Sequence, residues 1–171
     1  MPTLLIASLA LLIQTPSATF KYDMPEGWTS KPPSSKMRLA DFVLPKADGD
    51  TEDATRGVTF FGGQGGTVQA NFDRWLTQME QPDGRASKDL ARTSVLKTHD
   101  LTLSIMDLPG TFVAAKAPGS TEHYNKPGFH LRAAVIEGNG GPFFVRLVGP
   151  AKTVAKWDAS VQAFFKSLRV E

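Results

Sequence analysis

The glycine-rich segment FGGQGGTVQANFDRW, residues 61–75, is the part of the sequence that most resembles a ligand-binding loop. Glycines before a helix can form a phosphate-binding loop, because backbone N–H groups at a helix N-terminus attract anions. A Walker A loop needs a lysine after its last glycine, but Thr67 follows Gly66 here. The fingerprint G-x-G-x-x-G also fails, because Val68 occupies the position of its third glycine. We therefore expect a tight turn that lets a strand and a helix pack closely, with anion binding as the alternative.

Three polar residues of the helix that follows form a row beside its apolar side. Asn71, Arg74 and Gln78 stand at i, i+3 and i+7, and such spacings share one side of a helix. An arginine can bind a carboxylate through two parallel hydrogen bonds, so this row, with Gly65 and Gly66, is a candidate binding strip. The alternative is structural: Arg74 pairs with a neighbouring carboxylate or with loop carbonyls and holds the helix to the sheet.

A polar connection, KAPGSTEHYNKPG at 116–128, carries a second group of reactive side chains. Glu122, His123 and Tyr124 are adjacent there, and they could act as acid and base if the loop folded over a pocket. The sequence has no G-x-S-x-G nucleophile elbow, and Ser120 has no evident base near it. We expect no catalytic site and keep His123 and Tyr124 as candidate binding residues.

Metal ligands are poorly arranged in this chain. The acidic stretch ADGDTED, residues 47–53, offers carboxylates for calcium, but an EF-hand would need glycine at Asp53 and glutamate at Thr59. The three histidines lack paired spacing, and there is no cysteine, so a zinc site has no ligand set. We expect neither a metal nor a cofactor.

Two amphipathic helices and several strands define the expected fold. One helix follows the glycines, with Thr67 as its N-cap and Pro82 beyond its end. Its apolar stripe has a period of 3.6 residues and consists of Val68, Phe72, Trp75, Leu76 and Met79. A second helix, with Pro150 in its first turn, closes the chain and presents Val154, Trp157, Val161, Phe164, Phe165 and Leu168 on one face.

The segments between the helices are short and rich in strand-forming residues. Strands are expected at 37–45, 57–61, 93–98, 101–108, 110–115, 129–137 and 142–148. Turns are expected at His99-Asp100, Pro109-Gly110 and the GNGG of 138–141, and strands joined by tight turns are antiparallel. The sequence therefore predicts an α+β protein, with polar loops at 46–57 and 116–128.

The length of the sequence indicates a single domain, and its N-terminal segment indicates export. Its 171 residues are a one-domain length. The net charge is +2 with scattered basic residues, whereas nucleic-acid binding gathers them on one face. The apolar run of residues 4–13 is too short to span a membrane and is typical of a signal peptide, here 1–18, although MPTLL lacks a basic residue. We expect a periplasmic or secreted domain, 20–171, with no stable membrane span; the alternative is an uncleaved, buried N-terminal segment.

Three segments, FKYDMPEGW at 20–28, GGTVQANFDRW at 65–75 and GPAKTVAKWDASVQAFFKSL at 149–168, together resemble the PsbP-like superfamily in a bacterial-type member. Its members include an extrinsic photosystem subunit and a Ran-binding import factor. The resemblance covers 20–169 and implies an antiparallel sheet flanked by helices on both faces, an α/β/α sandwich. It also implies a non-catalytic role, in which the domain docks to an unidentified protein or cell-envelope assembly. The alternative is a small-molecule or anion-binding protein that uses residues 62–66 with Arg74.

Overall fold

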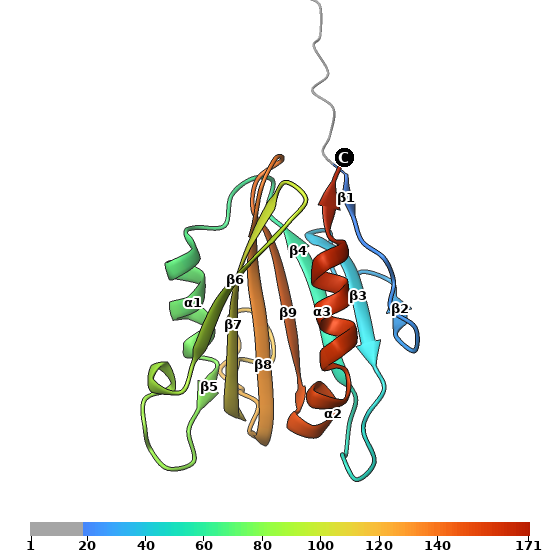
Figure 1. Cartoon of the computed structure of the whole chain (residues 1–171). Coiled ribbons are helices and arrows are strands. Elements are labelled where there is room, and N and C mark those ends of the chain that lie inside the picture. The colour runs from blue at the N-terminus through green and yellow to red at the C-terminus, as the bar shows by residue number, and fades with distance from the viewer. Residues whose placement is uncertain (1–18) are drawn as a thin grey trace, which may run out of the picture.

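The computed structural model describes residues 19–171, and its centre is one antiparallel β-sheet (Figure 1). The predicted signal peptide, 1–18, lies outside the described residues. The sheet strands are β2 (Thr29–Lys31), β3 (Arg38–Leu44), β4 (Ala54–Phe60), β5 (Met79–Glu80), β6 (Arg92–Thr98), β7 (Leu101–Phe112), β8 (Lys126–Glu137) and β9 (Phe143–Pro150). Their order is β2-β3-β4-β9-β8-β7-β5, and β6 also pairs with β7. A separate pair, β1 (Phe20–Lys21) with β10 (Arg169–Val170), joins the two ends of the described chain.

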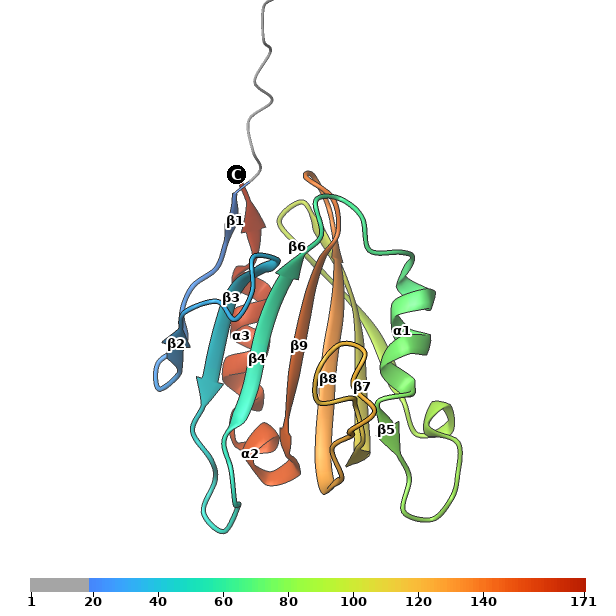
Figure 2. The ribbon, with the colours of Figure 1, turned by 180° about the vertical axis from the view of Figure 1, so that it is seen from behind.

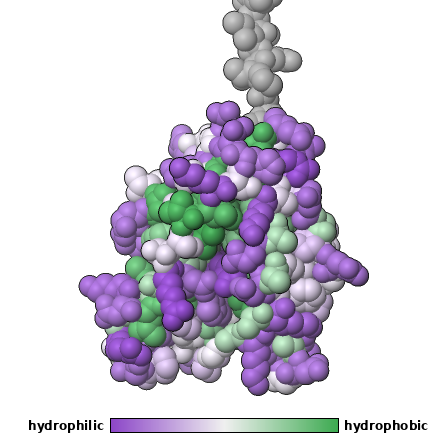
Figure 3. Space-filling model, viewed as in Figure 1, coloured by the Kyte–Doolittle hydropathy of each residue, from purple (hydrophilic) through white to green (hydrophobic). Residues whose placement is uncertain are grey.

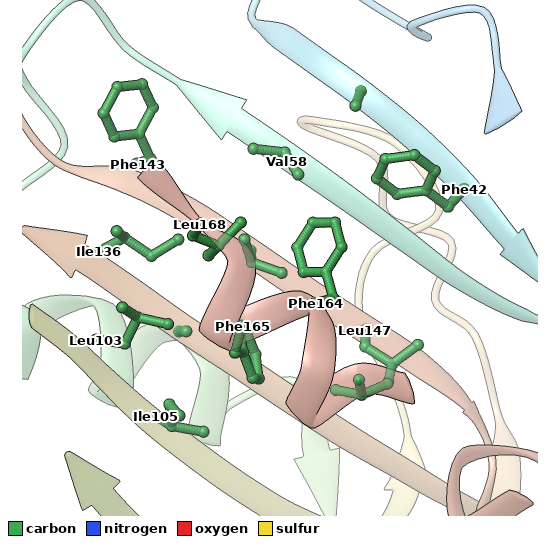
Figure 4. Packing of buried hydrophobic residues seen from close by; sticks show 14 of the residues in the cluster. Phe42, Val58, Leu103, Ile105, Ile136, Phe143, Leu147, Phe164, Phe165 and Leu168 are labelled. Atoms are coloured by element: carbon green, nitrogen blue, oxygen red, sulfur yellow. The ribbon is translucent and has the colours of Figure 1, made fainter. Parts of the chain in front are cut away.

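One face of the sheet is covered by the C-terminal helices α2 (Ala151–Lys156) and α3 (Asp158–Ser167). Phe164 and Phe165 of α3 are fully buried against a cluster of strand residues that includes Phe42, Leu103 and Ile136 (Figure 4). Burying a large apolar side chain contributes about 1.5–3 kcal/mol. This cluster therefore fixes α3 on the sheet.

The other face packs against α1 (Val68–Leu76), and in Figure 2 α3 lies behind the sheet. Phe72 and Trp75 of α1 belong to a second apolar cluster with Met106 and Leu108 of β7. Leu103 of the same strand, β7, belongs to the first cluster. Side chains along β7 therefore point alternately to the two clusters, because successive side chains lie on opposite faces of a sheet. Thr67 caps α1, accepting a hydrogen bond from the N–H of Ala70. A short 3-10 helix, η1 (Ser87–Asp89), follows β5.

Several sequence-based boundaries were wrong. The helix expected to carry Gln78 and Met79 ends at Leu76, and Met79 begins β5. Strand β8 begins at Lys126, inside the loop expected at 116–128. No turn forms at Pro109-Gly110, because β7 continues through it with a register irregularity before Phe112. The loop expected at 46–57 ends earlier, since β4 begins at Ala54. The closing helix is interrupted at Trp157, whose indole nitrogen donates to the carbonyl of Pro45 at 2.8 Å and so holds the residue toward the sheet.

The α+β class and the antiparallel sheet are confirmed. The turns at His99-Asp100 and residues 138–141 join β6 to β7 and β8 to β9. No helix in residues 19–171 is long and apolar enough to cross a membrane. The face that carries α3 is mainly hydrophilic around an apolar patch (Figure 3).

Candidate functional site

The glycine-rich loop packs against the sheet. Gly65 has a φ of +137° and Gly66 a φ of +79°, values that glycine adopts without steric cost. A Cβ atom added at Gly65 would lie 2.4 Å from the ring of Phe144 on β9. Trp75 is 3% exposed and shares an apolar cluster with Phe144. The loop therefore brings α1 close to the sheet.

Asn71 ties this loop to the helix from the inside. Its buried amide nitrogen donates to the carbonyls of Gly65 at 2.8 Å and Thr67 at 2.9 Å. Its amide oxygen accepts from Nη2 of Arg74 at 2.6 Å. Asn71 is thus committed to structure, whereas Arg74 is exposed and keeps donors for a ligand.

A groove lined by arginines runs over the sheet on the α1 face. It consists of two hollows of about 300 and 840 Å³ that share Ser34, Arg38 and Arg146, and we call it the arginine groove. A neighbouring hollow of about 770 Å³ is lined by Arg74 and Gly65, among others. Arg38 comes from β3 and Arg146 from β9, on either side of β4.

Gly57 of β4 forms the floor of the arginine groove. It pairs with Asp41 on one side and with Arg146 on the other. A Cβ atom at Gly57 would lie 1.4 Å from Nη1 of Arg38, so the guanidinium rests on this glycine. The register shift between Arg38 and Ala40 places Arg38 on the same face as Asp41, because a bulge redirects side chains.

Positive charge exceeds negative charge in this groove. Within residues 19–171, Asp41 is the one carboxylate paired with Arg38, Arg74 or Arg146, at 3.2 Å from Nη1 of Arg38. Arg146 donates to the neutral amide oxygen of Gln78 at 2.7 Å. Burial lowers the pKa of Arg146, and the charges of Arg38 and Arg74 lower it further. Charge repulsion of this kind is relieved when an anion binds.

The other predicted binding residues also reach the arginine groove. Gln78 lines the larger hollow and orients Arg146. His123 and Tyr124 line the same hollow, from the connection between β7 and β8 that crosses in front of the sheet in Figure 2. Nδ1 of His123 lies 2.8 Å from the carbonyl oxygen of Val113. The structure therefore gathers Gln78, His123 and Tyr124, and places Arg74 at the adjoining hollow.

Sequence reasoning missed Arg38, Gly57 and Arg146. They stand on three different strands and become neighbours only through sheet pairing. The usable signal was a glycine within an otherwise β-rich run, which indicates a bulge or a close approach of another group.

A second polar cluster lies on the α3 face. Asp107 of β7 is hydrogen-bonded to Nε2 of His130 and, at 2.5 Å, to Nε of Arg132. Arg132 also contacts Asp158, the first residue of α3, at 2.5 Å. Burial opposes ionisation of Asp107, but the hydrogen bond and charge of His130 and the charge of Arg132 outweigh it, so the pKa of Asp107 is lowered. The cluster borders a cleft of about 660 Å³.

The acidic loop is bound to the protein itself. Asp50 accepts from the N–H and hydroxyl of Thr153, at 2.8 and 2.6 Å. Asp53 accepts from the N–H of Lys46, and Glu52 lies 2.5 Å from Nζ of Lys126. In the described part of the chain, no three acidic or histidine side chains form a metal-binding group.

No protein-family model matches this sequence, and no curated protein matches it. Solved structures that are similar to it include the following two. A Pseudomonas aeruginosa protein of unknown function is 14% identical over 89% of this chain and 96% of its own, with a TM-score of 0.49. The cyanobacterial PsbP protein CyanoP of Synechocystis is 12% identical over 96% of this chain and 98% of its own, with a TM-score of 0.47.

Proposed function

We propose that this chain is a non-catalytic binding protein that holds an anionic group in the arginine groove. One observation carries the proposal. Among its described lining residues, the larger hollow contains Arg38, Lys116, His123 and Arg146 but no aspartate or glutamate. Its volume of about 840 Å³ lies in the range of small-molecule sites, roughly 300–1,000 Å³.

The proposed binding energy comes from two arginines that the fold has already oriented, of which Arg146 is also desolvated by burial. Gln78 fixes one nitrogen of Arg146, and Asp41 fixes one nitrogen of Arg38. The remaining guanidinium nitrogens of both residues have no hydrogen bond within residues 19–171 and remain available as donors. Charge-assisted hydrogen bonds to such donors are roughly twice as strong as neutral ones.

Calorimetric titration with citrate in a phosphate-free buffer of low salt tests this function. Arg146→Met should weaken citrate binding at least tenfold, because it removes the charge and keeps the packing volume. Arg92→Met is the matched control, since Arg92 is exposed on β6 outside the groove. Equal loss of citrate binding in both variants would contradict the proposal, and so would a wild type that binds neither citrate nor any of the other anions titrated below.

Two exposed apolar side chains beside Arg38 favour a second role. In this role an exported PsbP-like domain, with helices on both sheet faces, docks to a protein or cell-envelope partner. Met37 and Leu39, which flank Arg38, are 52% and 43% exposed. Affinity capture from the periplasmic or secreted fraction tests this role. A stoichiometric partner should be retained by wild type and lost in Met37→Ser with Leu39→Ser; a wild type that stays alone and monomeric would contradict it.

A further inference from the structure

We infer that the group held in the arginine groove is a doubly charged tetrahedral oxyanion of the phosphate-monoester class. This inference rests on the proposed function and names its ligand more narrowly. It follows from two properties of the groove: the directions from which hydrogen-bond donors approach and the local excess of positive charge.

Donors reach the junction of the two hollows from separate elements. Arg38 enters from β3 and Arg146 from β9, on opposite sides of Gly57. Ser34, before β3, lines both hollows. Its backbone N–H already donates to Asp41 at 2.8 Å, so its hydroxyl is the group that could donate to a ligand. A carboxylate presents two oxygens in one plane, which a single guanidinium satisfies. A phosphoryl group presents three acceptor oxygens, which suits donors that converge from several directions.

The charge excess also matches a dianion. Arg56 is buried among aromatic rings and Lys116 is paired with Glu122. The other cations that line the groove are Lys31, Arg38 and Arg146, and Asp41 is the one carboxylate among its described lining residues, so about two charges remain uncompensated. A phosphate monoester carries nearly two negative charges at pH 7, since its second pKa is about 6. A single carboxylate would neutralise only half of the excess.

Calorimetric titrations with methyl phosphate, sulfate and acetate between pH 5.0 and 8.0 test the inference. At pH 7.5 methyl phosphate should bind at least tenfold more tightly than acetate. Its affinity should fall about tenfold toward pH 5.0, because the ester loses its second charge near pH 6. Sulfate stays doubly charged throughout this pH range, so its affinity should change little. A pH-dependent change in sulfate affinity would therefore come from titration of the protein and not of the ligand.

Gly57→Ala supplies a variant that moves one guanidinium without removing a charge. Gly57 has no positive φ, so alanine suits the backbone, and the added carbon displaces the flexible end of Arg38. We expect at least a fivefold loss of methyl phosphate affinity, with little change for acetate. Unchanged phosphate affinity in this variant, with the wild-type melting temperature retained, would overturn the assignment of Arg38.

The outcomes separate this inference from the function on which it rests. If acetate and citrate bind as tightly as methyl phosphate, and Arg146→Met weakens them all, the groove binds anions but the phosphate assignment is wrong. If none of these ions binds, both proposals fail. Cosedimentation with phosphatidic acid vesicles identifies the source of the ester. If the protein sediments with the vesicles and Arg146→Met does not, the ester is a lipid headgroup. If the protein binds methyl phosphate in calorimetry but does not sediment with the vesicles, the ester is a soluble one.

Discussion

At the scale of single residues, Arg56 is the side chain least expected from its surroundings. It is 1% exposed, and none of its three guanidinium nitrogens has a hydrogen-bond partner. Instead the guanidinium carbon lies 3.9 Å from the ring centre of Phe164, 4.6 Å from that of Phe165 and 5.1 Å from that of Trp28. Burial lowers the pKa of Arg56 well below its usual value, with the charge of Arg132 adding to the effect.

Two opposing energies act on Arg56. A desolvated cation over aromatic rings gains about 2 kcal/mol or more, whereas burying a charge costs several kcal/mol. The cost is the larger, so we predict that Arg56→Met raises the free energy of unfolding by roughly 1–3 kcal/mol. Urea denaturation measures it, with Arg92→Met as the exposed control. A loss of stability in Arg56→Met would show that the aromatic contacts outweigh the burial of charge.

At the scale of elements, the sequence predicted α1 and most strands because their patterns are local. The period of the apolar stripe and the cap at Thr67 need no distant partner. The failures have tertiary causes. Pro109-Gly110 is typical of a turn, but Gly110 takes a φ of +152° inside β7, and a Cβ there would lie 2.7 Å from the carbonyl oxygen of Glu80 on β5.

The candidate site was predictable only in part for the same reason. Arg74 and His123 were identified from one helix and one loop, where spacing along the chain indicates proximity. Gln78 was placed on the same helix, but α1 ends at Leu76 and Gln78 lies in the connection to β5. Polar and apolar residues do not alternate regularly in the strand that contains Arg38. The reason is the register shift next to Arg38, which changes the face of the sheet on which it lies. Arg146 stands on a strand far along the chain, and only the pairing of β4 with β9 brings it to Gly57.

The loop before α1 offers a prediction about packing. Gly65→Ala should lower the free energy of unfolding by about 2 kcal/mol or more, because the new methyl group would overlap the ring of Phe144. Gly63→Ala is the matched control: Gly63 also has a positive φ, of +84°, but open space where its Cβ would be. Urea denaturation of both variants separates the contact from the backbone strain. If both variants lost the same free energy of unfolding, the contact between the loop and β9 would contribute nothing to stability.

At the scale of the whole molecule, two successive hydrogen bonds, from Arg132 to Asp107 and from Arg132 to Asp158, join the sheet to the start of α3. The folded protein holds the pKa of Asp107 below its usual value, which is about 3.9 in unfolded chains. Protons therefore bind the unfolded state more readily at acidic pH. The stability contributed by Asp107 is fully present above the unfolded pKa and is lost as pH falls through the lower, folded pKa.

Asp107→Asn tests this link between the layers. At pH 7 the variant should lose roughly 1–3 kcal/mol of unfolding free energy, because Arg132 and His130 lose their shared carboxylate. The wild type should lose this advantage progressively below about pH 5, so the two stability curves should converge on acidification. Asp48→Asn, at an exposed carboxylate of the loop between β3 and β4, is the control, and its stability should change with pH as that of the wild type does. A constant gap between Asp107→Asn and wild type at every pH would mean that Asp107 acts through its shape and not through its charge.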